Sequence, residues 1–142
     1  MPTAREYNDL RKGTWVGELG IQIVSVEPAG RLVGQVKLRK ELLSPNGSLH
    51  AGCIVTFADS MCGSGTMENL PSGARGYTTI ELKANLIGTA RDGIIECEAT
   101  LVHGGRTTQV WDAKVISKPS DKTLALFRCT QLILYPEPVR AK

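Results

Sequence analysis

The sequence predicts an α+β domain in which one substantial helix packs against a mostly antiparallel sheet of about six strands. Three observations lead to this prediction. The segments follow the order β-β-α-β-β-β-β, the strands are joined by short turns, and only one long apolar segment has helical spacing. A length of 142 residues with 42% hydrophobic residues is sufficient for one core. We therefore expect a single domain over residues 1–142.

The first half of the chain predicts a short polar helix followed by a hairpin. Charged residues dominate residues 3–13, where we expect the short helix. A β-rich segment at 19–26 is joined by the EPAG turn to residues 31–40, which alternate apolar and polar side chains. Such alternation is typical of a strand with one buried face. The long helix is expected over roughly residues 49–68.

The second half of the chain predicts four more strands and a tail. TARDG, HGGR and KPSDK are compact turn sequences between them. The strands are expected at residues 78–88, 94–103, 107–117 and 123–135, and the tail at 136–142. One helix covers only part of a curled six-stranded sheet, so the exposed edges favour a homodimer or homotetramer.

Composition and charge exclude several classes of protein. The net charge is +3, and the Lys and Arg residues are scattered, so we expect no nucleic-acid partner. The N-terminal segment is polar, and no apolar stretch has the length of a membrane span. The four cysteines form no CxxC pair and have no histidine at metal-ligand spacing. We therefore expect buried free thiols, no metal, no cofactor and a cytoplasmic location.

The long helix carries a carboxylate within an apolar pattern. Ile54, Ala58, Met61 and Gly65 form its buried stripe, and Asp59 lies at the border of that stripe. Two interpretations remain open. Asp59 could face solvent or bond a backbone group, or it could be a functional carboxylate whose pKa is raised by desolvation.

The residues before this helix favour the functional interpretation. Gly47-Ser48-Leu49-His50-Ala51-Gly52 places small residues where the first helical turn leaves backbone N–H groups unpaired. The helix dipole favours negative charge at this position. The segment therefore predicts an oxyanion-binding site, with His50 as an anchor for the turn.

The sequence resembles the hotdog-fold acyl-CoA thioesterases, in particular the phenylacetate-pathway and 4-hydroxybenzoyl-CoA thioesterase branch. The pattern of that branch is roughly N-x-x-G-x-x-H-G-G, followed nine residues after the histidine by a helical Asp or Glu. Gly47, His50, Gly52 and Asp59 fit this spacing, and the strand order is the same. Ser44 stands in place of the asparagine and Ala51 in place of one glycine. The resemblance covers about residues 15–135 and implies a hotdog fold, a curled antiparallel sheet around one central helix.

The resemblance also implies roles for individual residues. Asp59 would be the nucleophile or general base, and the Ala51 N–H would be the main oxyanion donor. The candidate catalytic residues are Asp59, Ala51, Gly52, His50, Ser44 and Thr79, and the candidate substrate-binding residues are Gly47, Asn46 and Arg106. Thr79 corresponds to a hydroxyl near the attacking water, although threonine is also a common strand residue. Arg106 is a candidate for the CoA phosphates, or a solvated turn residue.

These roles predict an acyl-CoA thioesterase for small or aromatic acyl groups, with sites at the dimer interface. The alternative from a different class is a non-catalytic acyl-CoA binder on the same fold. Hydratase chemistry ranks lowest, because it requires a His and a carboxylate as a pair and here His50 belongs to the turn.

Overall fold

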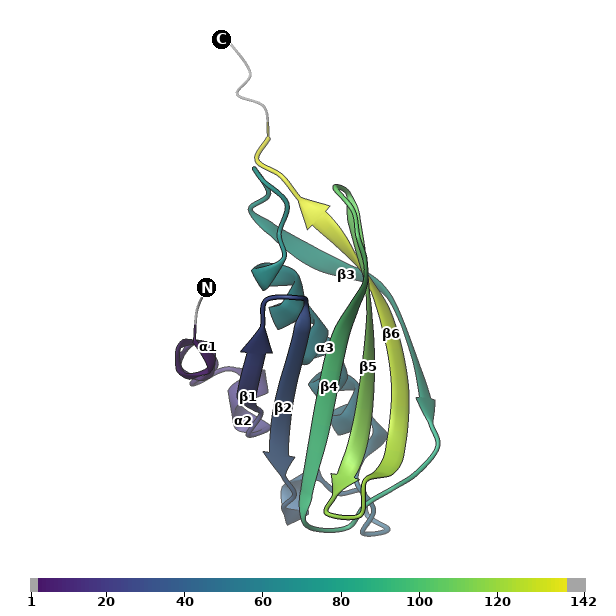
Figure 1. Ribbon diagram of the computed structural model, residues 1–142. Helices are drawn as coiled ribbons and strands as arrows, with labels where there is room; N and C mark the ends of the chain where they lie inside the picture. Colours follow the sequence, from purple (N-terminus) through teal and green to yellow (C-terminus); the bar gives the residue numbers. More distant parts are fainter. Residues whose placement is uncertain (1–2, 138–142) are drawn as a thin grey trace.

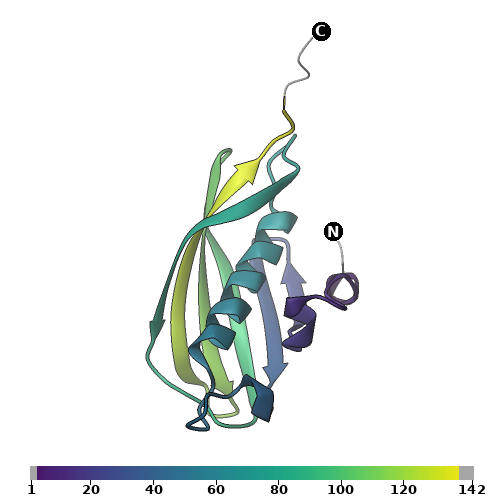
Figure 2. The ribbon, with the colours of Figure 1, turned by 180° about the vertical axis from the view of Figure 1, so that it is seen from behind.

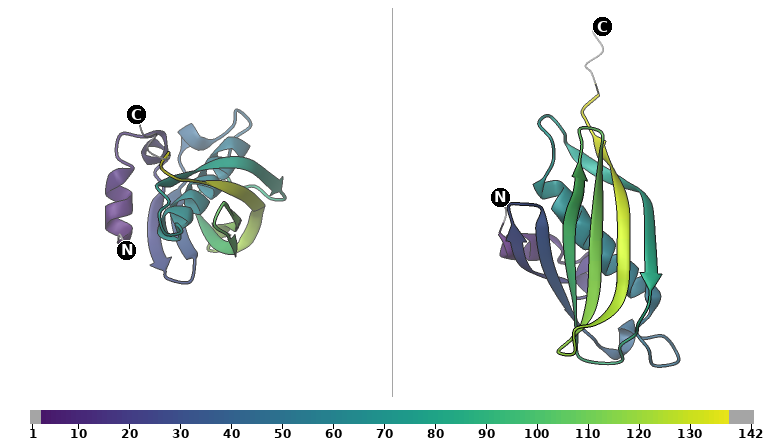
Figure 3. Two further views of the ribbon diagram at one scale, coloured as in Figure 1. Left: turned by 90° about the horizontal axis from the view of Figure 1, so that it is seen from above. Right: turned by 45° about the vertical axis from the view of Figure 1, so that its right-hand side comes forward.

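A computed structural model describes residues 3–137 of the chain. The long helix α3 (Ala51–Glu68) lies in the concave face of a six-stranded sheet. The sheet curls around the helix when the molecule is viewed from its end (Figure 3). This arrangement confirms the predicted α+β hotdog fold. Residues 138–142 of the expected tail lie outside the described residues.

The strands occur close to their predicted positions. All neighbours in the sheet are antiparallel, in the order β1-β2-β4-β5-β6-β3 (Figure 1). The bounds are β1 Gln22–Glu27, β2 Arg31–Lys37, β3 Gly76–Leu86, β4 Ile94–Gly104, β5 Thr108–Lys118 and β6 Lys122–Leu134. The connection from β2 to β3 contains a short 3-10 helix, η1 (Lys40–Leu42), and α3. This long crossover places β3 at one edge of the sheet and β1 at the other.

The N-terminal segment forms two short helices, α1 (Ala4–Leu10) and α2 (Trp15–Glu18), instead of the single helix expected over 3–13. Thr3 caps α1, because its hydroxyl accepts from the Glu6 N–H while the Glu6 carboxylate accepts from the Thr3 N–H. Asn8 then joins α1 to the free side of β1. Its amide accepts from the Ile23 N–H at 2.7 Å and donates to the Ile23 carbonyl at 3.1 Å. The backbone groups of Ile23 at this sheet edge are therefore satisfied within the chain.

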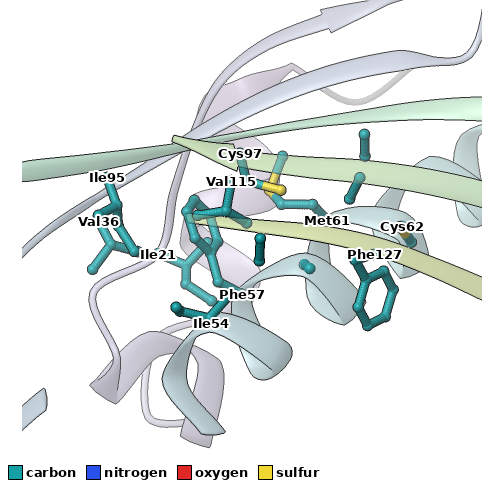
Figure 4. Packing of buried hydrophobic residues seen from close by; sticks show 14 of the residues in the cluster. Ile21, Val36, Ile54, Phe57, Met61, Cys62, Ile95, Cys97, Val115 and Phe127 are labelled. Atoms are coloured by element: carbon teal, nitrogen blue, oxygen red, sulfur yellow. The ribbon is translucent and has the colours of Figure 1, made fainter. Parts of the chain in front are cut away.

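Helix α3 packs large side chains against the concave face of the sheet. Figure 4 shows Ile54, Phe57 and Met61 extending from α3 towards the sheet, and all three are buried. The predicted stripe is confirmed, since Ala58 and Gly65 are buried with them. Cys62 and Thr66, on the adjacent face of the helix, are also inaccessible to solvent. The buried Thr66 hydroxyl is satisfied within the helix, because it donates to the Cys62 carbonyl at 3.0 Å.

The cysteines follow the sequence prediction. All four are free thiols; Cys62, Cys97 and Cys129 are buried, and Cys53 is partly exposed. Within residues 3–137, no helix combines the length and apolarity needed to cross a membrane.

Close approach of α3 to the sheet depends on glycine. A Cβ atom at Gly65 would lie 2.4 Å from the Trp111 ring, and one at Gly63 would lie 2.0 Å from the Tyr77 hydroxyl. Trp111 is fully buried, and its indole N–H donates to Gln109 Oε1 at 2.9 Å, so the ring has no space to move. The helix can reach its observed depth only because these positions lack side chains.

We predict that Gly65→Ala lowers the free energy of unfolding by about 1–3 kcal/mol, the usual cost of overpacking a core. The matched control is Gly76→Ala, because a Cβ atom there meets nothing within 4 Å. Urea denaturation at one protein concentration measures both variants. Equal stabilities for the two variants would contradict the packing argument, since alanine in a helix is otherwise more favourable than glycine.

Candidate active site

The turn before α3 is built by the residues of the Ser44-Pro45-Asn46-Gly47 sequence. The Gly47 N–H donates to the Ser44 carbonyl at 2.8 Å, and the Ser44 N–H donates to the Ser48 carbonyl at 2.7 Å. The Asn46 side chain accepts from the Ser48 N–H at 3.0 Å. Gly47 has a φ of 78°, a left-handed conformation that favours glycine. In the isolated chain, the polar groups of Asn46 and the backbone groups of Ser44 and Gly47 therefore hold this turn.

His50 fixes the first turn of α3. Its backbone N–H donates to the Leu42 carbonyl at 3.0 Å, and its ring Nδ1 accepts from the Gly52 N–H at 2.9 Å. A side chain at position 52 would press on this ring, because a Cβ atom there would lie 3.0 Å from Nδ1. The neutral ring consequently carries its proton on Nε2. His50 is thus the helix cap, and Gly52 is what allows the cap to close.

The cap leaves one backbone donor available at the start of α3. The N–H of Gly52, one of the candidate catalytic residues, already donates to His50 Nδ1. The Ala51 N–H has no acceptor among residues 3–137, and Ala51 is exposed. It lies at the positive end of the helix dipole, where an anion or a polarised carbonyl is stabilised.

Asp59 lies about two turns further along α3. Its carboxylate is partly buried, and Thr79 on β3 donates to its Oδ1 at 3.1 Å. Burial raises the pKa of Asp59, and the hydrogen bond from Thr79 offsets part of that increase. The structure therefore brings together two of the predicted residues, Asp59 and Thr79, in a setting that suits a general base.

Thr79 is itself held from the other side. Its hydroxyl also lies 2.9 Å from the Oε1 atom of Gln131, a fully buried residue on β6. The Gln131 amide donates to the Cys129 sulfur at 3.3 Å. A hydroxyl has one proton, so Asp59 and Gln131 compete for it. This arrangement fixes the position of Thr79 and couples Asp59 to the core of the sheet.

Asp59 borders a cavity of about 430 Å³ between α3, β3 and the N-terminal helices. Tyr77 and Ser64 line the same cavity, as does Arg11 from the end of α1. Burial raises the pKa of Tyr77, and the nearby charge of Asp59 raises it further. The volume lies in the range of small-molecule sites. Ligand-sized space is therefore present beside the carboxylate.

Arg106 lies away from these groups within one chain. It is exposed in the hairpin between β4 and β5, with its guanidinium carbon 5.8 Å from the centre of the Tyr135 ring. The Tyr135 hydroxyl donates to the Arg106 carbonyl at 2.6 Å. The hairpin adjoins the C-terminal end of α3, because Gln109 at the start of β5 donates to the Asn69 carbonyl at 2.6 Å. Arg106 is consequently at the opposite end of α3 from Ala51.

The thiols provide no alternative nucleophile in this cavity. Cys62 is fully buried, and its hydrogen bond with Cys129, together with burial, raises its pKa. Burial also raises the pKa of Cys53. A raised pKa disfavours the thiolate that nucleophilic chemistry requires.

Sequence reasoning missed three residues of this region, Tyr77, Gln131 and Arg11. Tyr77 and Gln131 are ordinary strand residues in the sequence, and only the pairing of β3 with β6 brings Gln131 to Thr79. Arg11 appears in the sequence as one of several charges in a polar helix. Its burial beside α3 depends on how α1 packs, for which the sequence pattern has no signal.

Residues 46–123 match the Thioesterase superfamily. A 1,4-dihydroxy-2-naphthoyl-CoA hydrolase of Listeria monocytogenes is 31% identical over 112 residues, which are 79% of this chain and 89% of that protein.

Solved structures share the fold over nearly the whole chain. Thioesterase HI1161 from Haemophilus influenzae superposes with a TM-score of 0.90 at 22% identity, covering 99% of this chain and 96% of that one. The PaaI protein from the phenylacetic acid degradation operon of E. coli gives a TM-score of 0.79 at 21% identity, covering 90% and 89% of the two chains.

We predict that Thr79→Val raises the pKa of Asp59. The hydrogen bond from Thr79 stabilises the charged carboxylate, and valine cannot donate it. Carbon-13 NMR of the aspartate carboxyls, assigned with an Asp59→Asn sample, measures the titration directly. Thr78→Val is the control, since Thr78 is the exposed neighbour on β3. An Asp59 pKa that stays constant or falls in Thr79→Val would contradict the role of this hydroxyl.

Proposed function

The chain belongs to the thioesterase superfamily, and from this premise we propose that it hydrolyses small or aromatic acyl-CoA thioesters at a site shared by two subunits. Membership of this family makes the protein a thioester hydrolase, which decides against the non-catalytic binder. The name of the Listeria monocytogenes relative specifies an aromatic acyl-CoA, and this supports the same class of substrate here.

The observation that carries the proposed mechanism is the environment of Asp59. A partly buried carboxylate with a raised pKa borders a ligand-sized cavity and is oriented by Thr79. A carboxylate of increased basicity can accept a proton from water or attack the thioester itself. Asp59 is therefore proposed as the general base or nucleophile.

In the general-base route, Asp59 takes a proton from water while the water oxygen bonds to the thioester carbon. The carbonyl oxygen then becomes an oxyanion, and the Ala51 N–H donates to it. Collapse of this tetrahedral species breaks the C–S bond. The CoA sulfur leaves with the proton held by Asp59, and the acid product retains the oxygen from water.

One chain does not supply both groups to a single carbonyl. Ala51 and Asp59 are eight residues apart on α3, which corresponds to about 12 Å along the helix axis. Both would have to lie within about 3 Å of the reacting atoms. We therefore propose that Asp59 of one subunit faces Ala51 of the other.

The exposed edge of the sheet provides the surface for this assembly. Along β3, the side chains of Ile80, Leu82 and Leu86 are 54%, 43% and 46% exposed. A long apolar edge strand of this kind is normally covered. We propose a homodimer formed through β3, or a homotetramer of two such dimers. Arg106 would then contact the CoA phosphates of a shared site, since its own Ala51 is at the far end of α3.

Asp59→Asn is expected to lower kcat by about 10²–10⁴-fold, the usual value of general-base catalysis, with little change in acyl-CoA binding.

Because burial raises the Asp59 pKa, ionisation of Asp59 costs stability as the pH rises through that pKa. Asparagine removes this cost, so the melting temperature at pH 7 should stay equal or rise. For the wild type, kcat/KM should fall as the pH is lowered through the Asp59 pKa, above the usual value of about 4. Undiminished kcat in a correctly assembled variant would refute the catalytic role.

A heterodimer tests the shared site directly. Ala51→Pro replaces the N–H donor by a ring carbon, and the helix should tolerate it because proline suits the first helical position and His50 already has an extended conformation (φ −69°, ψ 134°). Each variant alone should lose about 10²-fold or more in kcat. In a shared site, a heterodimer of Asp59→Asn with Ala51→Pro contains one intact site and should recover about half of the wild-type activity.

The heterodimer is purified through two different affinity tags, one on each variant. A site contained in one chain predicts no recovery, because neither subunit then carries both groups. Light scattering on the same samples checks the assembly, and a monomer at micromolar concentration would exclude the shared site.

A further inference from the structure

Arg11 is a buried cation with no counter-ion in the part of the chain that the structure describes. It is only 8% exposed, and its Nη2 donates to the Ser64 hydroxyl at 2.7 Å. Its Nη1 is buried and has no hydrogen-bond partner among the described residues. Within residues 3–137, no carboxylate lies within 4.0 Å of the guanidinium. Nothing in this part of the chain neutralises the charge.

Burying an unpaired guanidinium lowers the stability of the folded chain. A guanidinium remains protonated in proteins, so it cannot escape the cost of burial by losing its charge. Burial lowers the pKa of Arg11, which reflects this cost. Buried charges are normally paired, and an unpaired donor on a buried charge is destabilising. The position is therefore better explained by a ligand than by the fold.

Arg11 is one of the residues that line the cavity bordered by Asp59, and its unpaired Nη1 atom is covered by the surrounding chain. Asp59 is not its ion-pair partner, because the two are not within 4.0 Å of each other. The charges of both groups act on Tyr77: the Asp59 charge raises the pKa of Tyr77, while the Arg11 charge lowers it. The cavity lining thus includes a carboxylate, a cation and a tyrosine whose pKa responds to both charges.

We propose that Arg11 binds a carboxylate carried by the acyl group, so that the substrate is the CoA thioester of a small dicarboxylic acid. This inference rests on the proposed function, since the thioester end of that acyl group would be held at Asp59. On binding, the covered Nη1 atom would turn towards the cavity and donate to the carboxylate, while Ser64 holds the guanidinium through Nη2.

Charge and size favour this ligand. A neutral hydroxyl would satisfy the donor but would leave the buried charge uncompensated. The CoA phosphates are a poor match, because the cavity of about 430 Å³ is also lined by Leu10 and Val16 and suits a small acyl group. An acyl chain ending in a carboxylate satisfies both the charge and the apolar wall.

The test compares substrates of similar shape in the assembled wild-type enzyme. Glutaryl-CoA, adipoyl-CoA and 3-carboxybenzoyl-CoA are paired with 5-methylhexanoyl-CoA, 6-methylheptanoyl-CoA and 3-isopropylbenzoyl-CoA, which replace the carboxylate by an isopropyl group. At least one pair should show kcat/KM about 10- to 100-fold higher for the carboxylate, as expected for a hydrogen bond to a charged group. A 4-hydroxybenzoyl-CoA and benzoyl-CoA pair should show a smaller preference.

Arg11→Met removes the charge and keeps the volume. The ratio of kcat/KM within the preferred pair should fall to about one, a comparison that cancels general effects on the enzyme. Without substrate, the melting temperature of Arg11→Met should rise, because an uncompensated buried charge has been removed. Lys12→Met is the matched control, since Lys12 is 77% exposed in its ion pair with Asp9 and should alter neither measurement.

Each outcome has a definite meaning. A wild-type enzyme that turns over neutral acyl-CoAs without preferring any carboxylate overturns this proposal and leaves the proposed function standing. A preference for the hydroxybenzoyl substrate alone also overturns it. A lower melting temperature in Arg11→Met, with equal loss on both members of the pair, would show that Arg11 is structural. No turnover of any acyl-CoA would refute the proposed function itself.

Discussion

The depth at which α3 packs into the curled sheet determines the rest of the structure. The helix contacts the sheet so closely that its backbone meets Tyr77 and Trp111 where glycines stand. This contact fixes the distance between Asp59 on the helix and Thr79 on β3, which are joined by a hydrogen bond of 3.1 Å. A helix held further out would leave both groups in water. The carboxylate would then lose the desolvation that raises its pKa.

Two charged groups are kept in this region at the expense of stability. Arg11 is buried and Asp59 is partly buried, and the two do not form an ion pair with each other. Stable domains normally avoid such groups, so their presence beside a cavity is a functional signal. The tolerance for them comes from the large apolar core around α3, which includes Phe57 and Met61 (Figure 4).

Most of the fold could be predicted from local sequence patterns, whereas much of the site could not. Alternation in residues 31–40 and helical spacing after His50 are properties of short segments, and the corresponding strand and helix formed as expected. Asp59 was detectable because a carboxylate lies at the border of an apolar stripe. Gln131 was not, because its importance arises from the pairing of two strands 52 residues apart at Thr79. Arg11 escaped prediction for a related reason, since an arginine in a polar helix gives no indication of burial.

The hydrogen bonds between Asn8 and Ile23 make the two edges of the sheet unequal in their capacity to pair with another strand. On β1, a side chain of the same chain already occupies backbone groups that another strand would need, while β3 carries no such cover among the described residues. A subunit with two unpaired sheet edges could add further copies at both edges and grow into a fibre. A subunit with a single unpaired edge can pair with only one further copy through it, after which no unpaired edge remains. By occupying the backbone groups of Ile23, this small amide makes the addition of a strand less favourable at β1 than at β3.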